Sequence, residues 1–218
     1  MLTALLGGTF DPIHYGHLRP AISLANEVGL KQIRLLPNHI PPHKPQPEAN
    51  IEQRLAMLSL AIEDLPLFLL DVSEILSEAS TRPSYTVETL QAWRCKNGSQ
   101  KPLAFIMGQD SLLGLPTWHK WQTLLDYCHL LICRRPGYTE HTNNIELQQW
   151  IDMHQTNDIK DLHNSPNGYI YLAQTPLEDI SATEIRQNIN NVARCKNLLP
   201  PKVWRYIHTQ GLYGTKKK

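Results

Sequence analysis

The feature that most constrains the fold of this chain is a regular alternation of two hydrophobic patterns. Short apolar runs, typical of buried strands, alternate with longer stretches in which apolar residues recur every three or four positions, as on one face of a helix. The runs predict strands over residues 2–6, 32–36, 67–72, 103–107, 129–133 and 169–173. The periodic stretches predict helices over residues 18–28, 51–65, 87–98, 121–127, 145–154, 183–189 and 203–210.

Strands that alternate with helices form βαβ units, which give a mostly parallel sheet with right-handed crossovers. We therefore expect an α/β fold, Rossmann-like and doubly wound, with helices on both faces of the sheet and a helical part at the C-terminus. Ligands of such sheets bind at the carboxyl ends of the strands. The segments that follow residues 6, 36, 107, 133 and 173 are therefore where a site is expected.

Local signals place several helix ends. Asn50 and Gln53 have the spacing of a capping box before the second predicted helix. Gly29 and Gly211 are expected to end the first and last helices, and Pro20 is expected in a first turn, where its missing N–H is tolerated.

Size and composition fit one globular domain over residues 1–213, followed by a solvated basic tail over residues 214–218. A chain of 218 residues can bury about 70% of its surface without a disulfide or metal to staple it. Apolar residues make up 41% and charged residues 19%, which excludes a disordered chain. The formal net charge of +1 argues against a nucleic-acid or anionic-membrane partner.

The cysteines and the apolar runs indicate the cellular compartment of the protein. The four cysteines show no CxxC spacing, no run approaches the ~18 residues of a membrane span, and the N-terminus lacks the pattern of a signal peptide. We therefore expect a cytoplasmic protein with reduced thiols and no membrane partner.

The first segment with chemical content follows the first predicted strand and reads Gly7-Gly8-Thr9-Phe10-Asp11-Pro12-Ile13-His14-Tyr15-Gly16-His17-Leu18. Paired glycines let the backbone turn sharply and approach a ligand, and a helix N-terminus attracts phosphate. His14 and His17 are three apart, so they share a helix face. Neither GxGxxG nor a Walker A motif fits the segment. The alternative is a tight strand-to-helix turn with two incidental histidines.

The second such segment follows the last predicted strand and reads Ile180-Ser181-Ala182-Thr183-Glu184-Ile185-Arg186. Two hydroxyls and an arginine at the start of a helix can hold terminal phosphate oxygens. The alternative is ordinary N-capping by Ser181. In company with the first segment, we interpret this one as serving both roles.

These two segments resemble the nucleotidyltransferase superfamily with the HxGH signature, here His14-Tyr15-Gly16-His17. Between them lie further motifs in a matching order, and with these the chain resembles the bacterial nicotinate-nucleotide adenylyltransferases from near Leu5 to Tyr213. The intervening motifs are Pro37-Asn38-His39-Ile40-Pro41-Pro42-His43-Lys44, Ser84-Tyr85-Thr86, Gly108-Gln109-Asp110-Ser111 and Pro116-Thr117-Trp118-His119.

The resemblance implies that nicotinate mononucleotide and ATP, with Mg²⁺, give deamido-NAD and pyrophosphate. It implies that His14 and His17 contact the ATP phosphates, and that Ser181, Thr183 and Arg186 hold the departing pyrophosphate. His14, His17 and Arg186 are thus the expected catalytic residues. The remaining ATP contacts implied are Gly8, Thr9, Phe10, Gly108, Asp110 and Ile180. Asp110 suits a ribose hydroxyl, with helix N-capping as the alternative.

For the mononucleotide, Thr86, Trp118 and the backbone at His119 match the family's positions that recognise nicotinate. An indole can stack on a pyridine ring, although Trp118 could instead be a core aromatic. Asn38 and Lys44 could meet the mononucleotide phosphate, and Arg134 is a further candidate. The alternative for the two basic residues is a solvated side chain in a loop.

We expect no protein-bound metal. His14 with His17 and His39 with His43 could be mistaken for zinc-ligand pairs, but the prolines at 41 and 42 rule out helical geometry for the second pair, and no cysteine pair completes a site. Magnesium would arrive with ATP, held mainly by phosphates and waters.

Two rival functions remain open from the sequence. One is an adenylyltransferase of the same superfamily that acts on nicotinamide mononucleotide or phosphopantetheine. The other is a non-catalytic nucleotide-binding module, which would bind ATP without releasing pyrophosphate. The oligomeric state is left open between monomer and homodimer.

Overall fold

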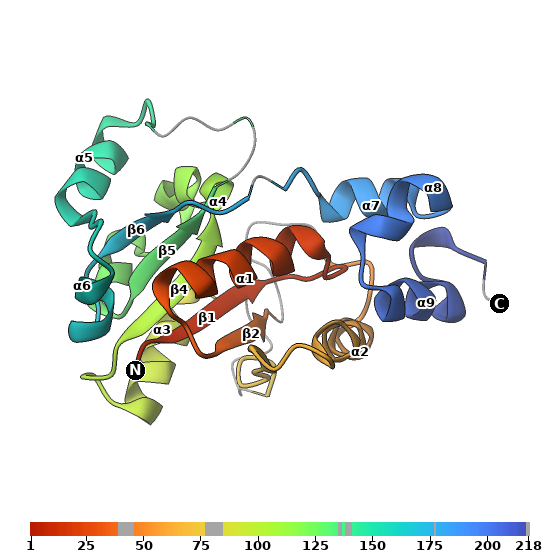
Figure 1. Ribbon diagram of the computed structural model, residues 1–218, viewed down its shortest axis with the longest axis horizontal. Helices are drawn as coiled ribbons and strands as arrows, with labels where there is room; N and C mark the ends of the chain where they lie inside the picture. The colour runs from red at the N-terminus through yellow and green to blue at the C-terminus, as the bar shows by residue number, and fades with distance from the viewer. Residues whose placement is uncertain (39–45, 77–84, 135–136, 138–140, 177, 217–218) are drawn as a thin grey trace.

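The computed structural model of the chain describes residues 1–38, 46–76, 85–134, 137, 141–176 and 178–216 (Figure 1). Its centre is a six-stranded sheet with the order β3-β2-β1-β4-β5-β6, in which every neighbouring pair is parallel. The strands are β1 (Thr3–Gly8), β2 (Ile33–Pro37), β3 (Phe68–Leu70), β4 (Leu103–Gly108), β5 (His129–Cys133) and β6 (Ile170–Ala173). The predicted fold class is confirmed, and each predicted strand is present.

Helices connect the strands and close the chain. They are α1 (Tyr15–Val28), α2 (Ile51–Ile62), α3 (Thr86–Asn97), α4 (Gln109–Leu113), α5 (Ile145–His154), α6 (Ile159–Asn164), α7 (Ala182–Asn188), α8 (Val192–Cys195) and α9 (Pro201–Gln210). The sequence did not predict α4, α6 or α8, because helices of four to six residues are too short to show a period. The predicted helix at 121–127 is a 3₁₀ helix, Trp121–Asp126.

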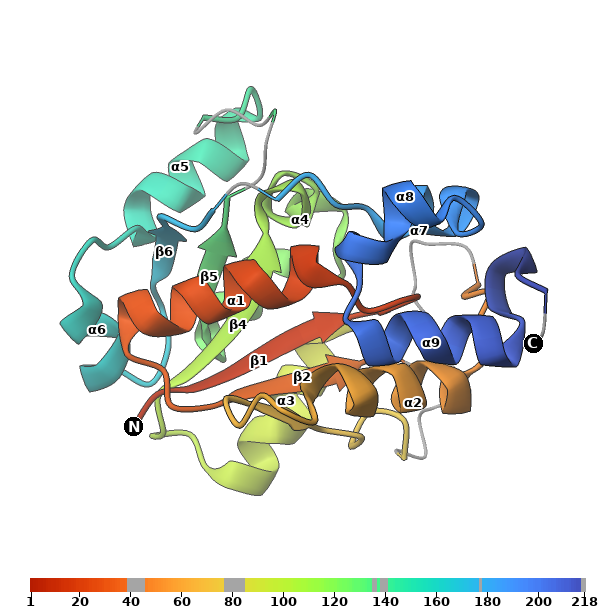
Figure 2. The ribbon, with the colours of Figure 1, turned by 45° about the vertical axis from the view of Figure 1, so that its right-hand side comes forward.

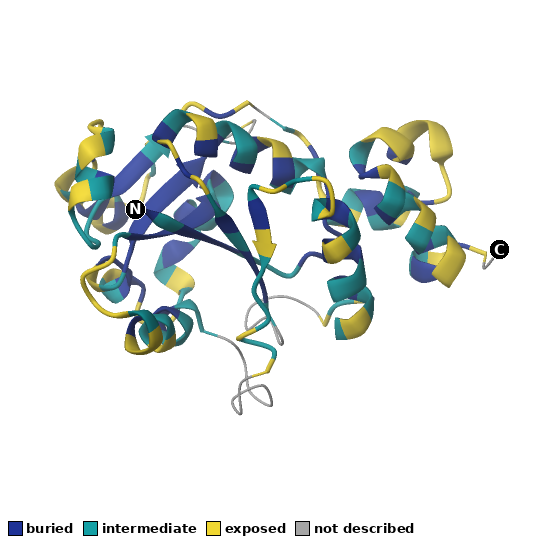
Figure 3. Ribbon diagram, turned by 60° about the horizontal axis from the view of Figure 1, so that its bottom comes forward, coloured by how far each residue is buried: buried dark blue, intermediate teal, exposed yellow. Residues whose placement is uncertain are grey.

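The sheet separates two hydrophobic cores, because alternate residues of each strand face opposite sides. The alternation is clear in β1, where Leu6 packs with the core under α1, α2 and α9 and Leu5 packs with the core under α3 and α5. Figure 2 shows α1, α2 and α9 lying together on one side of the sheet. Figure 3 shows that the strands are mostly buried, apart from β3, where Leu69 is exposed, whereas the outer faces of the helices are exposed.

Several predicted helix signals are present in the structure. Asn50 and Gln53 form the reciprocal capping box at the start of α2, with both hydrogen bonds at 2.9 Å. Gly29 and Gly211 end α1 and α9 in the left-handed conformation, with φ of 71° and 68°. The expectation for Pro20 is wrong, because α1 begins at Tyr15 and this places the proline in the second turn.

The C-terminal segment differs from the expected solvated tail. Thr215 is buried, and its hydroxyl donates to the carbonyls of Ile207 (3.2 Å) and Leu212 (2.8 Å). These bonds fold the segment back onto α9. Lys217 and Lys218 lie outside the described residues. Among the described helices, none is both long and apolar enough to span a bilayer.

Candidate active site

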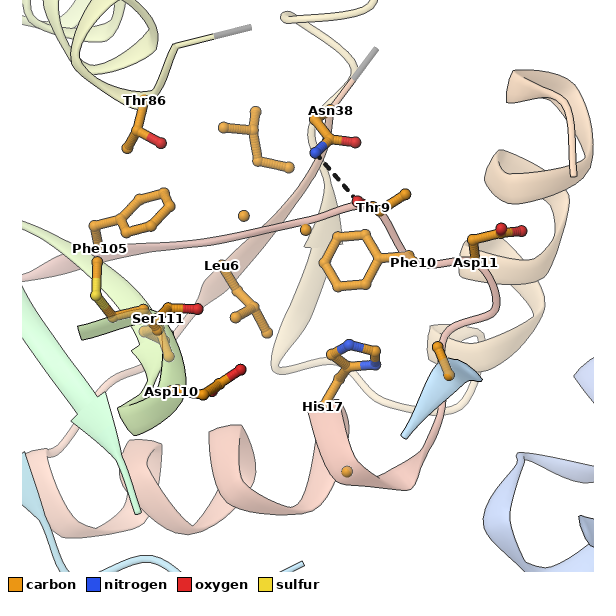
Figure 4. Close-up of a pocket in the computed structure, with 18 of the residues that line it drawn as sticks. Leu6, Thr9, Phe10, Asp11, His17, Asn38, Thr86, Phe105, Asp110 and Ser111 are labelled. Atoms are coloured by element: carbon orange, nitrogen blue, oxygen red, sulfur yellow. Dashed lines mark hydrogen bonds between the residues drawn. The ribbon is translucent and has the colours of Figure 1, made fainter. Parts of the chain in front are cut away.

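The strand order reverses between β1 and β4, and a cavity of about 640 Å³ opens at the carboxyl ends of the strands there. This is the position at which doubly wound sheets bind ligands, and the volume is that of a small-molecule site. Figure 4 shows side chains around it that come from β1, β4, α1, α3 and α4 and from the segments that follow β1 and β2.

The cavity brings together most of the residues singled out from the sequence. Those that line it are Gly8, Thr9, Phe10, His17, Asn38, Thr86, Gly108, Asp110, Trp118, His119, Arg134, Thr183 and Arg186. His14, Ile180 and Ser181 are not among its described lining residues. Lys44 lies outside the residues that the structure describes.

The turn after β1 is built differently from the expected glycine turn. Neither Gly7 nor Gly8 has a positive φ, and the left-handed residue is Phe10, with φ 51°. The two glycines are needed for packing instead. A Cβ on Gly7 would lie 2.7 Å from the Phe105 ring, and one on Gly8 would lie 2.9 Å from the Phe10 ring. The edges of two aromatic rings can therefore approach the strand closely, and both rings line the cavity.

The two signature histidines occupy different depths at the start of α1. Their rings stack with centroids 3.8 Å apart, and His14 is 1% exposed whereas His17 reaches the cavity. The backbone N–H of His14 donates to Nδ1 of His17 (3.3 Å). A neutral His17 therefore carries its proton on Nε2, which makes Nε2 a hydrogen-bond donor.

Gly16, the glycine of the HxGH motif, is required because a larger side chain would clash with its neighbours. A Cβ on Gly16 would lie 2.9 Å from Nδ1 of His14 and 3.0 Å from Cβ of Ile180. Only glycine lets the segment before α7 pack this closely on the start of α1. Ile180, expected at the nucleotide, is thus buried against α1.

Arg186 joins the second chemical segment to the first. Its Nη1 donates to the backbone carbonyl of Asp11 (2.7 Å), its Nε donates to Glu48 Oε1 (2.7 Å), and its Nη2 lies 3.5 Å from Thr183 Oγ1. Ser181 holds the N-cap position of α7, but within the described chain its side chain makes no capping hydrogen bond. The capping interpretation of Ser181 is therefore wrong, and its expected phosphate contact stays a prediction.

The opposite side of the cavity carries the residues expected to meet the mononucleotide. Thr86 is the first residue of α3, and Trp118 packs partly on the core beneath α3 while also lining the cavity. Its stacking on the nicotinate ring stays a prediction. The His119 ring lies 4.8 Å from that of Tyr85. The capping alternative for Asp110 is wrong, because Gly108 is the N-cap of α4.

The comparisons with known proteins decide the family. The cytidylyltransferase-like family model matches residues 5–188. A probable nicotinate-nucleotide adenylyltransferase of Yersinia pestis (strain Pestoides F) is 58% identical over 212 residues, covering 97% of this chain and 95% of that protein. This chain belongs to the nicotinate-nucleotide adenylyltransferase family.

Further members and solved structures agree with this membership. The probable nicotinate-nucleotide adenylyltransferase of Serratia proteamaculans is 58% identical over 98% of this chain and 96% of its own. The structure of the Plasmodium falciparum nicotinic acid mononucleotide adenylyltransferase complexed with NaAD has a TM-score of 0.68 at 19% identity, over 97% of each chain. A putative nicotinate-nucleotide adenylyltransferase from Vibrio parahaemolyticus has a TM-score of 0.62 at 13% identity, over 98% of this chain and 95% of that one. These two likenesses concern the fold alone.

In this member of the adenylyltransferase family, the Asp11 carboxylate connects several segments of the chain, a role that the sequence did not predict. Its carboxylate accepts the backbone N–H groups of Glu48 (2.9 Å) and Ala49 (3.1 Å) and the hydroxyl of Tyr213 (2.7 Å). Burial, and then the Asp11 charge, raise the pKa of Tyr213 well above its ordinary value. Asp11 lies within the motif after β1, but a partner 202 positions away leaves no local signal.

The end of β2 is tied to the end of β1. Asn38 Nδ2 donates to Thr9 Oγ1 (3.3 Å), as the dashed line in Figure 4 marks, and the Asn38 backbone N–H donates to the Gly8 carbonyl (3.0 Å). At the other edge, Arg134 Nη1 donates to Gln174 Oε1 (3.1 Å). Three loop residues were predicted to contact the mononucleotide. Asn38 and Arg134 line the cavity, whereas Lys44 lies outside the described residues.

The donor set of the cavity bears on magnesium. Among the described residues, no group of three or more His, Cys, Asp or Glu side chains could hold a metal ion. The Asp11 carboxylate is occupied by backbone amides and a tyrosine hydroxyl. That magnesium is ligated mainly by the substrate's phosphates and by water stays a prediction.

Proposed function

We propose that this chain transfers the adenylyl group of ATP to nicotinate mononucleotide and releases pyrophosphate, a step of NAD biosynthesis. The observation that carries the proposal is that one cavity is lined by His17 and Arg186 on one side and by Thr86 and Trp118 on the other. The first pair suits a triphosphate, and the second suits a flat ring that bears a carboxylate. The names of the relatives that share 55–58% identity support the same substrates.

In the proposed reaction, an oxygen of the mononucleotide phosphate attacks the α-phosphorus of ATP directly. The new P–O bond forms in line with the bond to the β-phosphate, which breaks and leaves with its electron pair as pyrophosphate. A phosphate monoester has a second pKa of about 6, so the attacking oxygen is already largely ionised at neutral pH. The chain therefore needs no general base.

The barrier is mainly electrostatic. Two unit negative charges 4 Å apart repel by about 4 kcal/mol at an effective dielectric constant of about 20, and a phosphate approaching a triphosphate brings several such pairs together. The Nε2–H of His17 and the guanidinium of Arg186 would offset this repulsion where charge builds up. The first N–H groups of α1 add a positive dipole end beside them. Magnesium bound to the phosphates would supply further neutralisation.

Preference for the acid over the amide would come from the α3 side. The Thr86 hydroxyl and the backbone near His119 offer donors that suit a carboxylate, while Trp118 can stack on the pyridine ring. The four cysteines are free thiols, which supports a reducing compartment such as the cytoplasm.

The test is incubation of the purified chain with ATP, Mg²⁺ and either nicotinate or nicotinamide mononucleotide, with pyrophosphate release as the readout. We expect release with both ATP and the acid present, and much slower release with the amide. Preference for the amide would contradict the role of Thr86 and Trp118. ATP binding without pyrophosphate release would favour a nucleotide-binding module.

A further inference from the structure

Arg54, in the first turn of α2, is an unusual residue because it is charged and almost completely buried. It is 2% exposed, whereas an arginine on a surface helix is normally in water. It is not among the described residues that line the cavity. Any effect of Arg54 on the reaction is therefore indirect, through the residues that it contacts.

The guanidinium bridges the loop after β1 and the loop after β2. One nitrogen, Nη1, donates to the backbone carbonyl of Thr9 (2.8 Å) and to that of Asn38 (2.9 Å). Thr9 follows β1, in the loop expected to hold ATP, and Asn38 follows β2, in the loop expected to meet the mononucleotide. Both carbonyls are thus held within hydrogen-bond distance of a single atom.

The surrounding charges keep this buried cation in place. Burial lowers the pKa of Arg54, and the nearby carboxylates of Asp11 and Glu74 act in the opposite direction. A guanidinium stays protonated in proteins, so the two bonds to carbonyls are charge-assisted and stronger than neutral ones.

A second buried arginine provides a natural comparison. Arg94 of α3 also donates to backbone carbonyls, those of Tyr127, Gly98, Ser99, Lys101 and Pro166. Several of these residues precede β4, β5 and β6, so Arg94 fastens loops at the amino ends of the strands. Arg54 makes the same kind of bond at the carboxyl ends, where the cavity lies.

We propose that Arg54 is a positioning residue, which fixes the distance between the ATP loop and the mononucleotide loop so that the two reacting phosphates meet in line. This inference rests on the proposed function. Because a displacement of about 1 Å in such an alignment can cost about 100-fold in rate, the effect of losing Arg54 falls on the joining step. Binding of each substrate by its own loop is affected much less.

The test compares steady-state kinetics of Arg54→Met, Arg54→Lys and Arg94→Met with those of the wild type, below the unfolding temperature of every variant. We expect kcat of Arg54→Met to fall by about 100-fold. Its KM values for ATP and for nicotinate mononucleotide should change much less than kcat. Arg54→Lys keeps the charge and a donor, so its kcat should lie between those of the wild type and Arg54→Met. Arg94→Met should unfold at a lower temperature with kcat unchanged.

The kinetic results of the variants decide whether Arg54 has the positioning role. A kcat of Arg54→Met equal to that of the wild type, or reduced no more than that of Arg94→Met, would overturn the positioning role. If Arg54→Met does not fold, Arg54→Lys decides, since a wild-type kcat in that variant would overturn the role and a reduced kcat would support it. A wild-type protein that releases no pyrophosphate would overturn the proposed function itself, and this result is separate from any effect of the variants.

Discussion

Removing the hydroxyl of Tyr213 tests whether the C-terminal segment holds the active-site loop in place. The hydroxyl donates to the buried Asp11 carboxylate at 2.7 Å, across 202 positions of sequence. A hydrogen bond to a charged group contributes about 1.5–3 kcal/mol to stability. Asp11 keeps two backbone N–H donors in Tyr213→Phe, so we expect a loss of about 2 kcal/mol, near the middle of that range. For a chain of this length the loss corresponds to a fall of about 4–8 °C in Tm.

The measurement is thermal unfolding of Tyr213→Phe beside Tyr127→Phe. The Tyr127 hydroxyl accepts a hydrogen bond from the neutral side-chain amide of Gln91 (2.8 Å), so its removal should cost about 1 kcal/mol or less. Equal losses in the two variants, or no loss in Tyr213→Phe, would refute the reasoning.

The pH dependence of the same variant gives an independent check. The pKa of Tyr213 is raised in the folded protein, so the folded state holds the phenol proton more tightly than the unfolded state does. The resulting contribution to the free energy of unfolding is complete below the unfolded pKa of about 10 and is lost as pH rises above it. The wild type should therefore lose more stability than Tyr213→Phe between about pH 9 and about pH 11. Parallel curves across that range would contradict the assigned contact.

Three further predictions concern single residues. His17→Ala should lower kcat by about 10²–10³-fold with a much smaller change in KM, as expected for a donor aimed at developing charge, and near-normal turnover in steady-state assays would remove His17 from that role. Gly16→Ala should cost about 1–3 kcal/mol in chemical unfolding, because its Cβ would lie 3.0 Å from Cβ of Ile180, and a fully stable variant would contradict this packing. Burial lowers the pKa of His129, so the unfolded state takes up the proton first and stability should fall as pH drops below about 6.5. His129→Gln does not titrate and should show a smaller fall in Tm from about pH 7 to about pH 5.

Sequence reasoning succeeded where the determinants are local. The helix ends depend on neighbours within one turn, as in the capping box of Asn50 and Gln53 and at the glycine that ends α9. The strands depend on runs of apolar residues. The part of the cavity lining that follows the strands was predictable, because the carboxyl ends of parallel strands must meet at one edge, whereas Thr86 and Trp118 were named only through the family resemblance.

The rest depends on contacts that no local pattern encodes. No local pattern shows that the charged Arg54 is buried, and only the fold shows that it lies beneath two loops. The bond between Asp11 and Tyr213 joins opposite ends of the chain. Gly7 and Gly8 suggested a flexible turn, but the side chains that require them are Phe105 and Phe10, and the spacing between those rings and the strand cannot be read from the sequence.

The central claim is that two distant segments hold one triphosphate between them, and a crystal structure with a non-hydrolysable ATP analogue tests it most directly. We predict Nε2 of His17 and the guanidinium of Arg186 within hydrogen-bond distance of phosphate groups of the same analogue molecule. An analogue that binds elsewhere, or that contacts neither side chain, would contradict the account.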